Sequence, residues 1–436
     1  MVRRYLVTPF QKFVSIESSS GILLFGATLL ALAWANTYFG DVYQTIWQYN
    51  LGISTETYEF SKPLILWIND GLMAIFFFLI GLEIKRELLV GELNSSRKAA
   101  FPLFAAVGGM LFPIGLFFLL NQNPETKDAW GISMATDIAF SLAIITLLGK
   151  RIPLSLKIFL TAFAIVDDLG AVSVIAIFYS SSIKWTLLLY GLILLAILYF
   201  LSYRQIHAKY IILSFGIVIW FLFLKAGIHP TIAGVLLAFA VPIRQKIDIK
   251  TYSEILCQMS DKIKAATDND IPILTDEQIE ELDNLEDWTS KVQSPLQQLE
   301  HKLHNWVAFL IMPLFALSNS GVVFSSDVNL DTTLSTNIAI SLVAGKFIGI
   351  FLMSWIGVKL GLAELPKGVD FRQVMGISLL AGVGFTMSIF IANLAFPDNA
   401  VLLDSAKIGI LIGSLVAGVS GYLLLRLTTR KSVEAV

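Results

Sequence analysis

Charged residues and cysteine are both scarce in this sequence. Of its 436 residues only 15% are charged, 56% are hydrophobic and one is cysteine, while the mean hydropathy is +0.73. Soluble globular domains carry about 25% charged residues, so this composition excludes a soluble protein. The single cysteine, Cys257, excludes both a disulfide framework and a thiolate metal site within one chain.

Long apolar runs are what the sequence has in abundance. Stretches of roughly 17 to 25 apolar residues, enough to cross a bilayer core of about 30 Å, recur along most of the chain. We predict an all-α integral membrane protein with about twelve transmembrane helices. They lie near residues 21–38, 63–82, 101–120, 130–149, 154–180, 184–202, 210–225, 228–244, 305–325, 335–358, 373–396 and 405–427.

The basic residues are distributed unevenly between the two sets of connections. The first segment, MVRRYLVTPFQKFVSIESSS, is basic and amphipathic and lacks the features of a cleavable signal peptide. If it lies inside, most Lys and Arg residues fall in connections on the same side. The other side holds only Lys62, Lys127, Lys184, Lys225 and Lys407. The positive-inside rule therefore predicts that both termini are cytoplasmic.

Two polar connections interrupt the apolar pattern. Within residues 247–300, the segment TDNDIPILTDEQIEELDNLEDW contains no Lys or Arg, which is typical of a solvated, partly helical or disordered loop; a regulatory or partner-binding role is the alternative. Residues 39–62 alternate weakly between polar and aromatic residues, a pattern compatible with a short external hairpin. The predicted parts are an amphipathic cytoplasmic segment (1–20), transmembrane helices 1–8 (21–246), the acidic cytoplasmic insertion (247–300), transmembrane helices 9–12 (301–428) and a cytoplasmic tail (429–436).

The segment TAFAIVDDLGAV places two adjacent carboxylates, Asp167 and Asp168, inside an apolar run. An ionised side chain in a bilayer costs from about 3 to over 10 kcal/mol, so such residues indicate function and need partners. The candidate partners are Asp137, Lys346 and His229. Neighbours on a helix point about 100° apart, so we expect one aspartate to face an aqueous cavity and the other to be paired. The alternative, two acids at a wet helix end, conflicts with the apolar residues on both flanks.

Two of the predicted spans contain residues typical of a broken helix. Thr136 and Asp137 interrupt the fourth span in MATDIAFS, and Gly382, Gly384 and Thr386 interrupt the eleventh in LLAGVGFTMSIF. Their placement fits two inverted three-helix repeats, spans 3–5 and 10–12, in which the interrupted helices cross near the bilayer midplane. Breaks in corresponding halves point to the site of a transporter.

A crossing of two broken helices requires charge compensation. The half-helix termini that meet there each carry about half a unit charge. We expect Asp137 to neutralise the positive ends and Lys346 the negative ends. Burial raises the proton affinity of a carboxylate, and hard oxygen ligands suit Na+ and Li+ as they suit Mg2+ and Ca2+, so one aspartate can hold either a proton or a cation.

Several long motifs resemble the NhaA family of Na+/H+ antiporters. They are TDIAFSLAII, AIVDDLGAV, GLEIKRELLVGEL, KAGIHPTIAGV, LEHKLHNWVAFLIMPLFALSNSGV and AGVGFTMSIFIANLAF, and they cover nearly the whole chain apart from the acidic insertion. The resemblance implies that Asp168 is the principal cation-binding and proton-carrying carboxylate, with Asp167 as the second essential acid. It matches Asp137 to the acid at the first helix break. Lys346 corresponds to a lysine that pairs with the first aspartate or balances the crossing.

The resemblance also gives a role to charged residues near the cytoplasmic ends. From the residues alone these are solvated helix ends, or a weak metal pair at His301 and His304. The family likeness implies a funnel involved in pH response, formed by Glu83, Arg86, Glu87, Glu300, His301 and His304. Histidine titrates near neutral pH, and His229 matches an external histidine with a similar role, although it could be a plain helix-start residue.

We therefore predict export of Na+ or Li+ in exchange for protons, in pH and sodium homeostasis, by a multi-pass protein of a bacterial inner membrane. The expected partners are Na+, Li+, H+ and the lipid bilayer, with a homodimer implied by the family and neither a cofactor, an enzymatic activity nor a nucleic-acid partner expected. The serious alternative is a proton- or sodium-coupled symporter of a small organic ion, which would need a roomy, aromatic-lined site. An intramembrane aspartyl protease lacks its Y-D and G-x-G-D signatures at these residues, and a passive channel needs no titratable pair.

Overall fold

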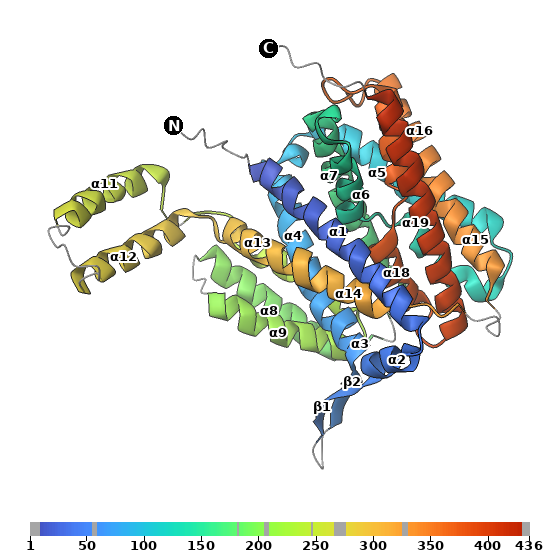
Figure 1. The fold of residues 1–436 in the computed structure, drawn as a ribbon. Helices are drawn as coiled ribbons and strands as arrows, with labels where there is room; N and C mark the ends of the chain where they lie inside the picture. Colours follow the sequence, from blue (N-terminus) through green and yellow to red (C-terminus); the bar gives the residue numbers. More distant parts are fainter. Residues whose placement is uncertain are drawn as a thin grey trace.

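The chain folds as a bundle of long helices with one small β-hairpin (Figure 1). The computed structural model describes residues 9–54, 59–180, 183–204, 209–245, 247–265, 276–324 and 330–429. Its first half contains α1 (Pro9–Ala35), α2 (Gly40–Gln48), β1 (Asn50–Ser54), β2 (Glu59–Pro63), α3 (Leu64–Leu66), the π-helical η1 (Trp67–Leu72), α4 (Met73–Val90), η2 (Glu92–Asn94), α5 (Ser96–Leu120), the 3-10 helix η3 (Pro124–Met134), α6 (Ile138–Leu147), η4 (Gly149–Arg151), α7 (Leu154–Phe178), α8 (Trp185–Tyr203) and α9 (Lys209–Ala226).

The second half contains helices and no strand among the described residues. It contains α10 (Pro230–Ala240), α11 (Ile249–Ala265), α12 (Asp276–Val292), α13 (Pro295–Trp306), the π-helical η5 (Val307–Ile311), α14 (Met312–Asn319), α15 (Thr332–Ile340), the π-helical η6 (Ser341–Gly345), α16 (Lys346–Lys359), α17 (Phe371–Leu380), α18 (Phe385–Ala395) and α19 (Ala400–Thr428). Side chains define several starts: Asp331 accepts a hydrogen bond from the backbone N–H of Leu334, and Asn399 from that of Leu402, which satisfies free donors of the first turn.

Length and apolar composition confirm a helical membrane protein. Six described helices are long and apolar enough to cross a bilayer, and up to nine if each of three bent pairs forms one span. This is fewer than the predicted number, because α10 and the apolar part of α9 (210–226) are shorter than a full span. The count of about twelve helices stays a prediction.

The bundle has two ends that are easily distinguished. The start of α1 and the end of α19 lie at one end, whereas β1 and β2 project from the other (Figure 1). We call these the terminal face and the hairpin face. The predicted hairpin within 39–62 is confirmed as an antiparallel pair in which Leu51 lies opposite Lys62.

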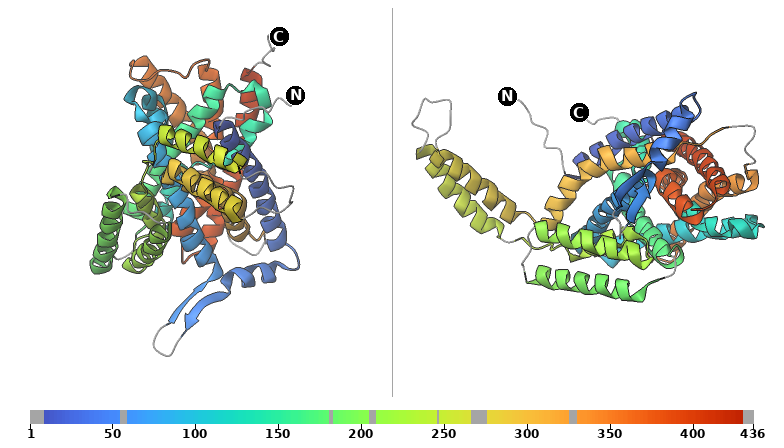
Figure 2. Two further views of the ribbon diagram at one scale, coloured as in Figure 1. Left: turned by 90° about the vertical axis from the view of Figure 1, so that its left-hand side faces the viewer. Right: turned by 90° about the horizontal axis from the view of Figure 1, so that it is seen from below.

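The acidic insertion is a separate helical unit. Helices α11 and α12 pack against each other and stand away from the bundle (Figures 1 and 2). The following helix, α13, already begins at Pro295, inside the range predicted for the insertion, and its buried Leu296 packs on the bundle. Helix α1 likewise runs through the predicted boundary at residue 20. Residues 1–8, 266–275 and 430–436 lie outside the described residues.

Two sets of helices make up the bundle. In one set α4 packs against α10, and α13 packs against α4; in the other, α5 packs against α16, and α19 packs against α15, α17 and α18. The α5–α16 crossing depends on glycine, because a Cβ on Gly108 would lie 2.0 Å from the carbonyl oxygen of Gly349. Such close backbone approach is typical of membrane helices that pack through small residues. The candidate functional site described below lies between these two sets of helices.

Candidate functional site

Two interrupted helices meet at the centre of the bundle. The first comprises η3 and α6, bent by 49° around residues 135–137; the second comprises α17 and α18, bent by 44° around residues 381–384. The backbone N–H of Asp137 donates to the carbonyl oxygen of Val383 at 2.7 Å. Each break therefore supports the backbone of the other, as unpaired polar groups away from water require.

Side-chain hydroxyl groups donate to three carbonyl oxygens at the ends of the broken helices. Thr136 donates to Ala381 O at 3.1 Å, and Ser141 donates to Leu380 O at 3.1 Å. In the opposite direction Ser388 donates to Ile132 O at 2.8 Å. These negative half-helix ends are bound by hydroxyls rather than by Lys346, for which we had expected that place.

Asp137 lies at the positive ends of both broken helices. Its Oδ1 accepts from the backbone N–H of Phe140 in α6 at 3.0 Å. Its Oδ2 accepts from the backbone N–H of Thr386 at 3.1 Å and from its hydroxyl at 2.5 Å. One buried carboxylate thus caps two helix N-termini, where negative charge is favourable.

Glycine allows the two breaks to approach closely. A Cβ on Gly384 would lie 2.9 Å from Ala135 O, and one on Gly382 would lie 2.8 Å from Leu342 O. A larger residue at position 384 would push the two breaks apart, and one at position 382 would push the second break away from η6. Both glycines of the second break therefore fit the predicted interruption.

The two adjacent aspartates have different surroundings, as helix geometry predicts. Asp167 forms an ion pair with Lys346 at 2.7 Å, and Lys346 also donates to the Thr136 hydroxyl at 2.7 Å. Asp168 instead lines a cavity of about 50 Å³ together with Glu83, Asp137 and Thr386. One aspartate is paired, and the other faces the cavity.

The cavity next to Asp168 is small and rich in oxygen atoms. Carboxylates and threonine hydroxyls converge there from α4, α7 and both broken helices. Hard cations prefer such ligands, and the volume suffices for an ion with a few water molecules. Pockets that bind drug-sized organic ligands measure about 300 Å³ or more. The carboxylates and hydroxyls can therefore exchange protons and hold a small cation.

Charged side chains continue from this cavity to the terminal face. His304 Nδ1 lies 3.8 Å from Glu83 Oε1. Arg86 contacts Glu300 and pairs with Glu87 at 2.8 Å. Burial raises the pKa of Glu300 to about 7 against the opposing effect of Arg86, which brings its titration into the neutral range.

The side chain of His301 is exposed on α13, whereas that of His304 is buried. The two histidines face different surroundings, so their spacing does not produce a metal pair. The structure thus brings together five of the six residues that the resemblance assigns to the funnel.

His229 lies on the hairpin face, far from this cluster in the fold. Its Nε2 is 3.8 Å from Asp70 Oδ1, and its Nδ1 shares a hydrogen bond with the Thr231 hydroxyl at 2.7 Å. Asp70 also pairs with Lys62 of β2 at 2.9 Å. Asp70 was not predicted from the sequence as a site residue, although the Asn-Asp-Gly run directly before an apolar helix could have indicated it.

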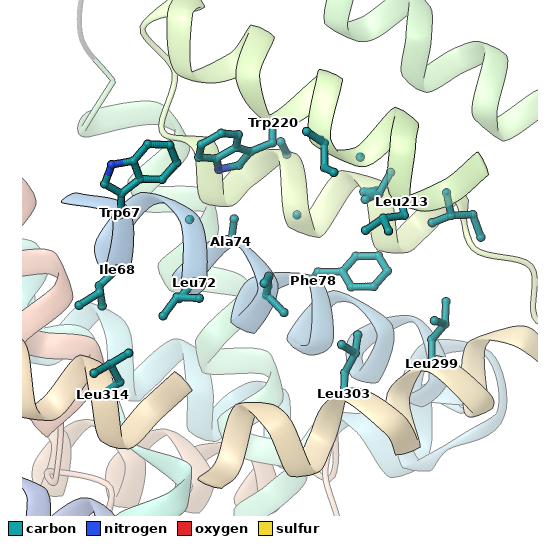
Figure 3. Close-up of a pocket in the computed structure, with 18 of the residues that line it drawn as sticks. Trp67, Ile68, Leu72, Ala74, Phe78, Leu213, Trp220, Leu299, Leu303 and Leu314 are labelled. Atoms are coloured by element: carbon teal, nitrogen blue, oxygen red, sulfur yellow. The ribbon is translucent and has the colours of Figure 1, made fainter. Parts of the chain in front are cut away.

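A larger cavity of about 770 Å³ lies elsewhere, between α4, α9, α10 and α13 (Figure 3). Its lining is almost entirely apolar and includes Trp67, Phe78, Trp220 and Leu303. It contains neither Asp137, Asp168 nor Lys346. Size alone would favour it, but the ionisable groups place the candidate site at the crossing.

The whole chain is similar to known Na+/H+ antiporters. A family model described as Na+/H+ antiporter 1 matches residues 11–425. Na(+)/H(+) antiporter NhaA of Oleidesulfovibrio alaskensis is 48% identical over 428 residues, covering 98% of this chain and 95% of that protein. The protein of the same name from Bacteroides fragilis is 45% identical over 422 residues, covering 95% and 96%, and Na(+)/H(+) antiporter NhaA 1 of Aliarcobacter butzleri is 42% identical over 435 residues, covering 100% of both chains. The chain therefore belongs to the NhaA family of Na+/H+ antiporters.

Proposed function

We propose that this protein exports Na+ or Li+ from the cytoplasm in exchange for external protons, with Asp168 as the shared binding group. The observation that carries the proposal is the placement of Asp168 in an oxygen-lined cavity beside the helix crossing. A carboxylate there can hold a proton or help to hold a small cation, but it cannot bind both tightly at the same time. Competition between the two ions at one group is the basis of exchange.

The remaining site residues have supporting roles in this proposal. Asp167 is held by Lys346, while Thr136, Asp137 and Thr386 add oxygen atoms near the cavity. The empty, ionised site cannot easily change sides, because its negative charge would be exposed to low dielectric. Transport in either direction therefore needs Asp168 to carry an ion, which couples the two fluxes.

The membrane arrangement is part of the same proposal. We place the terminal face in the cytoplasm of a bacterial inner membrane and the hairpin face outside, because basic residues predominate in the connections on the terminal side. About twelve helices with two inverted repeats, interrupted in spans 4 and 11, fit the positions of the two breaks. A homodimer, transport of Li+ and the role in pH and sodium homeostasis stay proposals from the family.

The pH response is assigned to the cluster at the terminal face. Glu83, Arg86, Glu87, Glu300 and His304 link that face to the cavity, and the titration of Glu300 near neutrality changes their total charge. His301 and His229, which the resemblance also implies, lie outside this cluster. Their contribution to the pH response needs a separate test.

A symporter of a small organic ion is the alternative on a similar fold. It required a roomy, aromatic-lined site, whereas the cavity at Asp168 measures about 50 Å³. Among the described residues, Phe76 is the one aromatic residue that lines this cavity. The geometry therefore favours an inorganic cation.

Everted membrane vesicles that contain the protein test the function. Adding NaCl or LiCl to acidified vesicles should release protons from the lumen, as reported by a pH-sensitive dye. Vesicles without the protein and an equal addition of choline chloride are the controls. Absence of a Na+ or Li+ response across neutral and alkaline pH, with the protein present in the membrane, would contradict the proposal.

A further inference from the structure

Three asparagine side chains, two of them buried and Asn393 partly buried, form a hydrogen-bonded cluster on the hairpin-face side of the bundle. Asn319 accepts from Asn69 at 3.2 Å and donates back to it at 2.9 Å. Asn393 donates to the same Asn319 Oδ1 at 3.0 Å. We call these residues the amide cluster. Asn319 is its centre, with no exposed surface.

The cluster joins the two sets of helices. Asn69 lies in η1, which leads into α4, and Asn319 is the last residue of α14. Asn393 lies in α18, which packs mainly on α19 and η3. Helix α14 continues from α13 through η5, so it belongs to the set of α4, α10 and α13. The bond between Asn319 and Asn393 therefore joins that set to the set that contains α18 and α19.

An aromatic layer separates the amide cluster from the cavity at Asp168. Phe390 of α18 lies 5.6 Å from Phe77 and 6.2 Å from Phe315 between ring centroids. The ring of His229 contacts Phe390 at 5.3 Å. These ring contacts join α4, α14, α18 and His229, the residue before α10.

The same order of residues occurs along two of the contributing helices. In α14, Met312 lines the cavity, Phe315 lies in the aromatic layer, and Asn319 lies in the amide cluster. In α18 the corresponding residues are Met387, Phe390 and Asn393. Six helical residues span about 9 Å, so the amides lie about two turns from the cavity on the hairpin-face side.

We propose that the amide cluster is the closure on the hairpin-face route to Asp168 and that its Asn319–Asn393 bond breaks once in each exchange cycle. This inference rests on the proposed function. Glu83, on the terminal-face side, lines the cavity, whereas the aromatic layer and the amide cluster lie on the opposite side. Exposing Asp168 to that side requires α18 to separate from α14.

Amides suit such a closure because their bonds are favourable in both states. When the route is closed, the amides satisfy one another, and a buried amide without a partner would be costly. When the route opens, water replaces the lost partner. A purely apolar layer would instead expose its surface to water at each opening.

The first test replaces the Asn319–Asn393 bond with a reducible bridge. In a Cys257→Ser background, Asn319→Cys and Asn393→Cys are joined by a short bismethanethiosulfonate. We expect Na+-driven proton exchange in vesicles to fall at least about tenfold when bridged and to return after reduction. Exchange at the same rate in the bridged and reduced protein would overturn the closure.

The matched control bridges two helices of one set on the same face. Ser335 of α15 donates to Ser405 O of α19 at 2.7 Å, and these helices pack extensively on each other. Bridged Ser335→Cys/Ser405→Cys should exchange at its reduced rate. Equal loss in both bridged pairs would overturn the assignment to the amide cluster, because any cross-link on this face would then have the same effect.

The second test does not depend on transport. Asn393→Ala should increase deuterium uptake by the backbone of α18 and η1 about fivefold, since one hydrogen bond that holds the closed state is lost. The control is Asn337→Ala, which removes another buried amide, bonded to Leu120 O at 3.3 Å. Unchanged uptake in Asn393→Ala would overturn the closure. The two failures are distinguishable. Absence of Na+ exchange in the parent protein contradicts the proposed function, whereas exchange in the parent protein that is unaffected by the Asn319–Asn393 bridge contradicts only the closure.

Discussion

Lys346 and Asp167 form an ion pair at 2.7 Å in which the two side chains are 0% and 1% exposed. Lys346 lies directly after the π-helical turn η6, and Asp167 lies in the middle of α7. The other carboxylate oxygen of Asp167 has no hydrogen-bond partner among the described residues. The lysine is therefore the main stabilising partner of this buried carboxylate.

Removing one member of this pair should destabilise the protein. Asp167→Asn leaves a buried ammonium group without its counter-charge, and breaking such a pair costs about 3–5 kcal/mol. The double variant Asp167→Asn/Lys346→Met should recover much of that loss, because no isolated charge remains. Thermal unfolding in detergent measures both effects.

An exposed ion pair provides the control for this comparison. Arg97 and Glu364 lie 3.3 Å apart with side chains 82% and 72% exposed, so Glu364→Gln should change stability little. If Asp167→Asn melts at the same temperature as the parent protein, burial of the Lys346 ammonium group does not require Asp167 as its counter-charge.

Asp168→Asn should abolish Na+ binding while preserving the fold. The amide keeps the shape of the side chain but removes its charge and its titrating proton. An ion that binds only the folded state stabilises it increasingly as the ion concentration exceeds the dissociation constant, so the Na+-dependent rise in melting temperature should disappear. Asp128→Asn, which changes an exposed residue of η3, should retain that rise. An unchanged Na+ response in Asp168→Asn would mean that the cation binds elsewhere.

Helix geometry predicted the different surroundings of Asp167 and Asp168, because it depends only on neighbouring positions. The Thr-Asp and Gly-x-Gly runs are local signals, and consecutive helices bend by 49° and 44° at these residues, while their place in two interrupted transmembrane spans stays a prediction. The hydroxyl bonds of Ser141 and Ser388 across the breaks could not be predicted in this way. They join residues 239 and 256 positions apart, and serine is common in packed membrane helices without such a role.

The amide cluster could not be predicted from the sequence for the same reason. Asn69 and Asn319 are 250 positions apart, and Asn319 and Asn393 are 74 apart. Each asparagine alone resembles an ordinary polar residue near a helix end. Only the packing of η1, α14 and α18 brings the three together, and no periodic pattern in one segment contains that information.

Glu300→Gln should remove part of the pH dependence of stability. Burial raises the pKa of Glu300 from 4.5 to about 7, so the folded state binds this proton more tightly than the unfolded state does. Its contribution to stability is complete below about pH 4.5 and is lost as the pH rises through about 7. The melting temperature of the parent protein should therefore fall over this range relative to that of Glu300→Gln.

His301→Gln is the matched control, since His301 is exposed on the same helix. The difference between the melting temperatures at acidic and at neutral pH should be the same in this variant as in the parent protein. Parallel pH curves for the parent protein and Glu300→Gln would show that Glu300 does not titrate in this window.

Replacing residues 249–292 with a short Gly-Ser linker should leave maximal exchange intact. This range contains α11 and α12, which pack against each other and stand away from the bundle (Figure 1). The deletion leaves α13 and its buried Glu300 in place. A correctly inserted deletion protein that fails to exchange Na+ would show that the acidic insertion takes part in transport.

Competition for Asp168 predicts how the apparent Na+ affinity depends on pH. If one proton must leave before Na+ binds, that affinity should fall about tenfold for each pH unit below the pKa of the site. The charged cluster near Glu300 should only set where this slope begins, because it lies beside the cavity and changes the local potential. Na+ titrations of exchange in vesicles at several pH values should therefore give the same slope for the parent protein and Glu300→Gln, displaced along the pH axis. An apparent Na+ affinity that is independent of pH in the parent protein would refute exchange at one shared carboxylate.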